Sequence, residues 1–226
     1  MCFTPPVSFA TFAIEWILAF IVLSRINKNP KDKKIYLLGA VLLFLLGLYQ
    51  FTEFMLCITN GIYFWATAGF LAYNFLPALA LHLSLILTKA KTEKKHIFLI
   101  YIIPIVYSIY AIISPNFTAS ATCRPLFIYV ERGWDPMTAW IYEAYYFLFI
   151  LISTLIFSKA IKKAQTKHEK KILILGASGL LGFTIPTLIL LLILPDLGII
   201  FPSVYCHFAI IYAILLFYLI RQIEKK

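Results

Sequence analysis

Three carboxylic acids lie inside long apolar segments, and they are the first residues whose type and position suggest chemistry. They are Glu15, Glu53 and Glu143. An ionisable side chain is costly inside lipid, so it faces the protein interior or a water-filled cavity and commonly belongs to a ligand, ion or proton site. These three acids are therefore the first candidates for a binding site.

Glu53 belongs to a polar stripe. Gln50, Glu53 and Cys57 are spaced i, i+3 and i+7, which places an amide, a carboxylate and a thiol on one face of a helix. Such a face should turn toward protein or water and away from lipid. Two interpretations stay open: a ligand site, and a hydrogen-bond network that only holds helices together.

Thiols and one histidine offer a second kind of chemistry. The four cysteines are Cys2, Cys57, Cys123 and Cys206, and His207 follows the last of them. The topology argued below puts all four on the outer side of the membrane, where oxidising conditions favour disulfides, with three pairings open. The alternative is a zinc or copper site made from the thiolates, His207 and Glu53. Neither C-x-x-C nor H-x-x-x-H spacing is present to support it, so no cofactor is predicted.

The composition indicates which elements must position these groups. Hydrophobic residues make up 62% of the 226 residues, charged residues 13%, and the mean hydropathy is +0.89. Soluble domains contain about 25% charged residues and could not bury so much apolar surface. Lipid is the solvent that fits. A helix crosses the bilayer in about 20 residues, so the length suits seven helices with short loops, forming one domain over residues 1–226.

Seven apolar runs predict an all-α integral membrane bundle of seven transmembrane helices. They cover residues 7–24, 35–58, 63–88, 97–114, 137–158, 172–194 and 203–220. Basic segments follow the odd-numbered runs and hold 18 of the 20 Lys and Arg residues. Basic loops stay in the cytoplasm, so the N-terminus is expected outside and the C-terminus in the cytoplasm. Anionic lipid headgroups account for the +10 net charge, and no nucleic-acid partner is expected.

Depth along the helices gathers the polar side chains. With a rise of about 1.5 Å per residue, Glu53, Glu143 and the start of the seventh helix fall in the outer third of the membrane, and Glu15 falls nearer the middle. We therefore predict an outward-facing polar pocket that binds a small ligand. Its predicted lining residues are Glu15, Gln50, Glu53, Asn74, Glu143 and His207.

Prolines and glycines indicate how the helices should pack. Pro77, Pro104 and Pro186 each remove a backbone donor and predict kinks, which suit a pocket. Glycines within residues 176–182 predict a close approach of helix backbones, either inside the bundle or at a dimer face. We expect His82, in the inner half of the third helix, to be packed or hydrogen-bonded.

The two ends of the chain resemble an uncharacterised family of prokaryotic seven-helix membrane proteins. The resemblance is carried by Met1-Cys2-Phe3-Thr4, by Gln50 with Glu53, and by Ser203-Val204-Tyr205-Cys206. Members of that family begin Met-Cys-Phe-Ser and end with a Ser-Val-Trp-Cys-like helix, so this chain differs at Thr4 and Tyr205. This resemblance implies a fold and no established activity.

Residues 34–190 are also similar to the seven-helix sensor region at the N-terminus of some bacterial and archaeal histidine kinases. The shared features are Glu53, Leu76-Pro77 with His82 before a basic loop, Ile103-Pro104, and the run Tyr142-Glu143-Ala144-Tyr145-Tyr146. In that family the kinase follows the seventh helix, whereas this sequence ends at Lys226. The resemblance therefore implies that signalling output would pass through a separate cytoplasmic partner.

Two functions from different classes follow. The first is a receptor-like sensor in the plasma membrane, in which a small ligand biases helix packing and a cytoplasmic signalling partner responds. The second is an intramembrane enzyme or a thiol or metal redox protein using Cys2, Cys206, His207 and Glu53, with a thiol activated by the neighbouring histidine. The sequence has no G-x-S-x-G, Walker or H-E-x-x-H motif, so the sensor is favoured over the enzyme.

Overall fold

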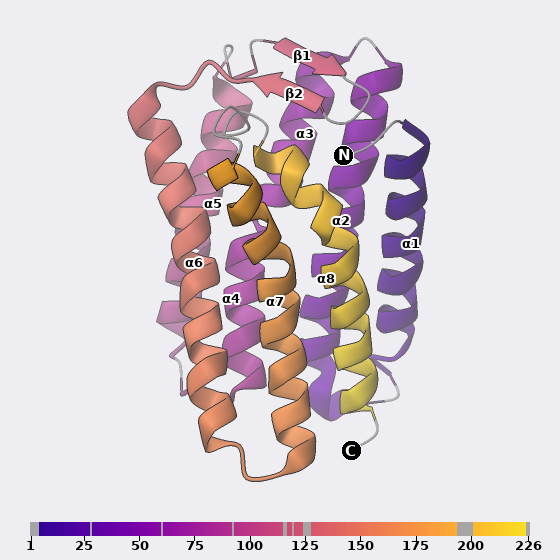
Figure 1. Ribbon diagram of the computed structural model, residues 1–226, viewed down its shortest axis with the longest axis vertical. Helices are drawn as coiled ribbons and strands as arrows, with labels where there is room; N and C mark the ends of the chain where they lie inside the picture. The colour runs from indigo at the N-terminus through magenta and orange to yellow at the C-terminus, as the bar shows by residue number, and fades with distance from the viewer. Residues whose placement is uncertain are drawn as a thin grey trace.

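The chain folds into a bundle of long helices because a helix satisfies its own backbone hydrogen bonds in lipid. The computed structural model describes residues 5–27, 29–59, 61–91, 93–114, 117–118, 120–123, 128–193 and 201–224. Over these ranges the helices are α1 (Pro5–Ser24), α2 (Lys33–Ile58), α3 (Ile62–Asn74), α4 (Leu76–Leu87), α5 (Lys94–Ile113), α6 (Pro136–Lys163), α7 (Lys167–Ile193) and α8 (Phe201–Ile223), with a short 3-10 helix at Pro30–Asp32 (Figure 1).

The helices α3 and α4 together form one span that is interrupted at Phe75. Pro77 lies in the first turn of α4, where its missing N–H costs little, and it cannot donate to the carbonyl four residues earlier in α3. The predicted kink at Pro77 is thus a break between two helices. Pro104 and Pro186, by contrast, lie inside the continuous helices α5 and α7.

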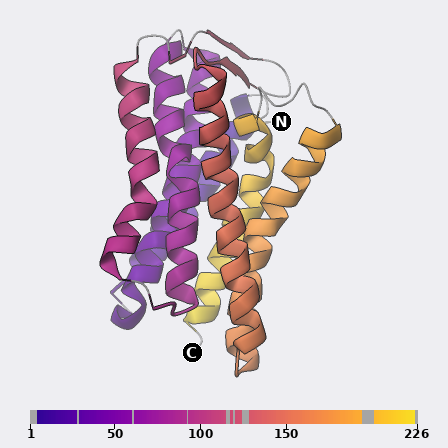
Figure 2. The same cartoon turned by 90° about the vertical axis from the view of Figure 1, so that its left-hand side faces the viewer.

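The bundle has two different ends. At one end, which we call the hairpin end, strand β1 (Ser120–Cys123) pairs antiparallel with β2 (Ile128–Glu131), with Ser120 opposite Glu131. This hairpin was not predicted from the sequence. The opposite, lysine-rich end holds the connections α1–α2, α4–α5 and α6–α7 and the end of α8. Figure 2 shows α6 and α7 side by side at their short connection, where α6 ends and α7 begins, and separating toward the hairpin end.

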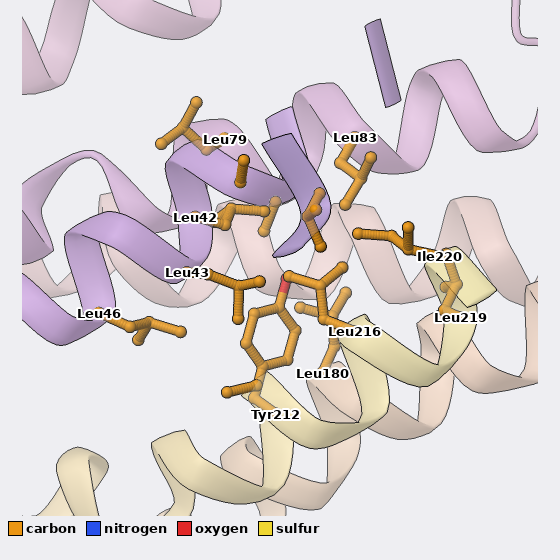
Figure 3. Packing of buried hydrophobic residues seen from close by; sticks show 14 of the residues in the cluster. Leu42, Leu43, Leu46, Leu79, Leu83, Leu180, Tyr212, Leu216, Leu219 and Ile220 are labelled. Atoms are coloured by element: carbon orange, nitrogen blue, oxygen red, sulfur yellow. The ribbon is translucent and has the colours of Figure 1, made fainter. Parts of the chain in front are cut away.

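An apolar core joins α2, α4, α7 and α8 in the lysine-rich half of the bundle. Figure 3 shows its central members: Leu42, Leu43, Leu46, Leu79, Leu83, Leu180, Tyr212, Leu216, Leu219 and Ile220. Gly39 lets α2 approach α8, because a Cβ there would lie 2.5 Å from Cδ1 of Ile220. Gly176 similarly faces the ring of Phe157 at 2.6 Å. Internal packing, the first of the two roles predicted for the α7 glycines, is confirmed for Gly176.

The outward faces of the helices are apolar, as contact with lipid requires. Large hydrophobic side chains are exposed along α1, α5 and α6, among them Phe9, Ile17, Phe20, Val106, Ile109, Ile112, Leu148, Leu151 and Leu155. Within the part of the chain that the structure describes, five helical segments are long and apolar enough to cross a membrane. The first five predicted spans coincide with these segments, and α7 and α8 coincide with the last two.

Candidate functional site

The most distinctive polar group at the hairpin end is the guanidinium of Arg132, which is inserted among aromatic rings. Its Cζ lies 4.8 Å from the ring centroid of Trp134, 5.1 Å from Phe70, 5.3 Å from Tyr73 and 5.8 Å from Phe117. Arg132 also donates a hydrogen bond from Nη2 to the Tyr73 hydroxyl. We call the rings of Phe70, Tyr73, Phe117, Trp134 and Tyr142 the aromatic cage.

The rings of the cage pack against one another, edge to face around Phe70 for three of its four neighbours and tilted for Tyr142. Phe70 is central, with centroid separations of 4.7 Å to Phe117, 5.3 Å to Tyr73, 5.4 Å to Tyr142 and 5.6 Å to Trp134. Such pairs contribute about 0.5–1.5 kcal/mol each beyond the burial of their area. The cage is therefore a rigid structure built by α3, α6 and two loop residues.

The backbone next to Arg132 is held by the start of α6. Asp135 is the N-cap residue of this helix, and its carboxylate accepts hydrogen bonds from both N and Oγ1 of Thr138, the first at 3.0 Å. These hydrogen bonds lower the pKa of the exposed Asp135 carboxyl. The Tyr107 hydroxyl donates to the Thr138 carbonyl at 3.0 Å and so joins α5 to the same turn.

Glu53 lies one layer deeper and is linked to the cage through two tyrosines. The Tyr49 hydroxyl donates to Oε1 of Glu53 at 2.7 Å, and the Tyr49 ring packs edge-on against Tyr73 at 5.2 Å. Gln50 is also buried, at 2% exposure. The predicted polar face of α2 therefore turns into the bundle.

A close approach of α2 and α3 keeps these residues in place. A Cβ at Gly69 of α3 would lie 2.6 Å from Oγ1 of Thr52, which itself donates to the Tyr49 carbonyl at 2.7 Å. Only a glycine leaves room for this contact without a shift. The position of Tyr49, and through it the Glu53 hydrogen bond, thus depends on Gly69.

Asn74 connects three helices at the break between α3 and α4. Its Nδ2 donates to the Pro104 carbonyl at 2.7 Å and to Oγ of Ser108 at 3.0 Å, both in α5. The Tyr145 hydroxyl of α6 donates to the Asn74 carbonyl at 2.8 Å. This arrangement supports the network interpretation for Asn74, and its role in ligand binding stays a prediction.

Glu15 is fully buried where α1 packs against α2. Neither carboxyl oxygen has a hydrogen-bond partner in the part of the chain that the structure describes. Its Cβ would be 3.3 Å from a Cβ added at Gly47, and Trp16 occupies the rest of that gap while donating to the Phe44 carbonyl at 3.2 Å. The position fits an uncharged carboxylic acid, since an isolated buried carboxylate is strongly disfavoured.

The chain matches a protein family described as the N-terminal 7TM region of histidine kinase, over residues 7–222. The chain belongs to this family. It is a multi-pass membrane protein with the seven-helix bundle of a histidine kinase sensor region, which confirms the second of the two resemblances and the predicted fold class. No curated protein and no solved structure matches the chain.

The residues predicted to line a pocket in this sensor region do not all come together. Glu53 and Gln50 share the inward face of α2, and Glu143 is half-buried within the electrostatic influence of Arg132. Glu15 lies against α2 at Gly47 and makes no polar contact with the others. His207 belongs to α8, but its side chain lies outside the described residues.

The disulfide pairing of the four cysteines stays a prediction, because only one cysteine side chain is described. Cys57 is half-buried near the end of α2 and is disulfide-bonded. The described residues do not include Cys2 or the side chains of Cys123 and Cys206. The three possible pairings therefore stay open. Among the side chains that are described, no three His, Cys, Asp or Glu residues are placed to hold a metal, so the zinc or copper alternative also stays a prediction.

Sequence reasoning missed Arg132 and the aromatic cage. A signal for Arg132 was present, because Arg124 and Arg132 are the only Lys or Arg residues outside the four basic segments. The aromatic share of 17% was visible too, but which rings meet depends on the approach of α3, α6 and the hairpin loop. The histidine prediction was simpler and is confirmed: Nδ1 of His82 is 2.8 Å from the Tyr101 hydroxyl.

Proposed function

We propose that the chain senses a small ligand at the hairpin end of the bundle and transmits its binding to a histidine kinase at the lysine-rich end. The observation that carries this proposal is the Glu53–Tyr49 hydrogen bond, because it joins the polar face of α2 to the cage that holds Arg132. Buried polar groups in a membrane bundle indicate function by default.

The distribution of Lys and Arg residues supports an orientation in which the hairpin end faces outward. The lysine-rich end carries the segments expected in the cytoplasm by the positive-inside rule. The hairpin end, with Arg132 and the cage, would then meet the external solution. A ligand arriving from outside would reach this layer first.

The helix α2 is suited to carry a change across the bilayer. It is continuous from Lys33 to Ile58, with Glu53 near one end and Tyr36 near the other. Tyr36 is fully buried and accepts a hydrogen bond at 3.2 Å from Nδ2 of Asn29. Gly39 of α2 packs closely on Ile220 of α8. A small rotation or shift of α2 would therefore displace α8.

The end of α8 is the part of the bundle from which output would leave. The matched region is N-terminal in histidine kinases, so α8 is the helix nearest the kinase in such proteins. Here Glu224 lies 3.8 Å from Arg25 of the α1 end and accepts a hydrogen bond from Arg221 at 3.0 Å. Lys171 of α7 donates to Gln222 at 3.1 Å. These contacts hold α8 against its neighbours, and a signal would loosen or reset them.

Hydrogen exchange of the chain in nanodiscs tests the transmission. Glu53→Gln replaces the carboxylate at the hairpin end by a neutral amide, whose oxygen accepts a weaker hydrogen bond from Tyr49, and we expect faster amide exchange in the last two turns of α8. Glu131→Gln is the matched control, because Glu131 is exposed at the hairpin end and accepts a hydrogen bond from Ser120 of the same hairpin. Altered exchange confined to α2 and α3 would contradict the proposal.

A further inference from the structure

We propose that the aromatic cage is a binding site for small organic cations of the guanidinium or alkylammonium class, and that Arg132 fills it when no such ligand is bound. This inference names a ligand class for the proposed sensor. Its consequence for signalling rests on the proposed function, whereas binding of the cation is tested separately.

The geometry of the cage is that of a cation site. Four ring centroids surround the Arg132 guanidinium at 4.8–5.8 Å, within the distance of about 6 Å at which ring quadrupoles attract cations. Trp and Tyr are the strongest partners in such contacts, and Trp134 is the ring nearest to the cation. The rings would offer the same attraction to any cationic head of similar size.

The charges around the cage favour cations over other ligands. Arg132 forms no ion pair with a carboxylate among the described residues, so rings and a phenol hydroxyl alone hold it. The carboxyl group of Glu143, on the same helix as Tyr142, interacts electrostatically with Arg132. Its charge would attract a ligand cation in place of the arginine.

The cage also has polar groups that Arg132 leaves without partners. The hydroxyl of Tyr142 and Nε1 of Trp134 are buried and have no hydrogen-bond partner among the described residues. Buried polar groups normally find one. A ligand whose N–H groups reach deeper than those of Arg132 would donate to the Tyr142 hydroxyl and gain a contact that the arginine lacks.

Arg132 is attached in a way that allows it to leave. It lies in the four-residue link between the end of β2 at Glu131 and the start of α6 at Pro136, and it is half-buried. Its side chain can withdraw without moving a helix. A tethered arginine reduces the apparent affinity for a free cation in proportion to the fraction of time for which the cage is free, so it sets the concentration at which a ligand binds.

Equilibrium binding of radiolabelled methylguanidinium to the full chain in nanodiscs tests this inference, with tetramethylammonium as a competitor. We expect saturable, millimolar binding to the unchanged chain and at least tenfold tighter binding to Arg132→Gln, which keeps most of the side-chain volume. Phe70→Leu should abolish binding in both backgrounds. Phe98→Leu is the matched control, because it makes the same change as Phe70→Leu at an exposed ring of α5 near the opposite end and should leave binding unchanged.

Two outcomes would overturn the inference. No binding to either chain would mean that the cage takes no free cation. Binding to Arg132→Gln alone, with none to the unchanged chain at tens of millimolar, would make Arg132 a permanent structural plug. If Arg132→Gln does not fold, binding to the unchanged chain and its loss in Phe70→Leu decide the question. If methylguanidinium binds but does not alter amide exchange in α8, the cation site is supported and only the proposed transmission is contradicted.

Discussion

The Tyr49 hydroxyl and the Glu53 carboxylate form a buried hydrogen bond of 2.7 Å within one helix. The same Tyr49 ring contacts Tyr73, which accepts a hydrogen bond from Arg132. An acid inside the bundle and a cation at its surface are therefore connected through two tyrosines on α2 and α3. This relationship distinguishes the hairpin end from the apolar core that joins α2, α4, α7 and α8 in the lysine-rich half.

Removal of the Tyr49 hydroxyl should destabilise the bundle. Tyr49→Phe deprives the buried Glu53 carboxylate of a donor, and we expect the free energy of unfolding in detergent to fall by about 1–3 kcal/mol. Tyr110→Phe is a suitable control, because the Tyr110 hydroxyl makes no hydrogen bond to a described residue. Equal stability of the Tyr49→Phe and unchanged chains would show that the bond contributes nothing.

The contact between Gly69 and Thr52 predicts a suppressor pair. Gly69→Ala places a methyl group where only 2.6 Å separates it from the Thr52 hydroxyl, and overpacking of this kind costs about 1–3 kcal/mol. Thr52→Ala removes the opposing oxygen. We therefore expect the double variant to be more stable than Gly69→Ala alone, as measured by thermal unfolding in nanodiscs. Additive losses in the double variant would refute the proposed close approach.

Loss of the Asn74 side chain should lower the free energy of unfolding, because its amide donates two hydrogen bonds to α5. Asn74→Leu leaves the Pro104 carbonyl and the Ser108 hydroxyl without their α3 donor, and we expect a loss of about 1–2 kcal/mol, near the upper end for membrane hydrogen bonds. Ser108→Ala, which leaves the Asn74–Pro104 bond in place, should cost less. If both variants have the same unfolding free energy as the unchanged chain, Asn74 is not the junction of α3, α5 and α6.

The start of α6 should respond to acid. The pKa of the Asp135 carboxyl is lowered in the folded chain by its hydrogen bonds to Thr138, so the folded state favours the ionised form. The stabilisation is complete above the ordinary Asp pKa of 3.8 and is lost as the pH falls through the lower folded value. The protection factor of the Thr138 amide, which is the intrinsic exchange rate at each pH divided by the measured rate, should fall over this range, and Asp135→Asn should make it independent of pH. A protection factor that still falls with acid in Asp135→Asn would contradict this assignment.

The amino-acid sequence predicted the parts of this fold that depend on solvent preference and local spacing. Lipid selects long apolar helices, so the seven spans and the inward face of Gln50 and Glu53 followed from hydropathy and helical period. Helix packing at Gly176 followed from the absence of a side chain. Each of these inferences requires only the sequence of one helix and the polarity of the medium around it.

The remaining features depend on contacts between segments far apart in the chain. Arg132 contacts Tyr73 and Phe70, which precede it by 59 and 62 positions in the chain. No local sequence pattern predicts a contact over such a separation. The separation of Glu15 from the other acids likewise depends on how α1 turns toward α2. Depth along a helix was predictable, but the direction of approach between helices was not.

The central claim is that the hairpin end and the end of α8 are coupled through α2. The most direct measurement is the rate of oxidative crosslinking in a chain carrying Arg25→Cys and Glu224→Cys, since these positions face each other at the lysine-rich end. We predict that adding Glu53→Gln changes this rate several-fold, whereas adding Glu131→Gln does not. The same crosslinking rate with and without Glu53→Gln would contradict the coupling.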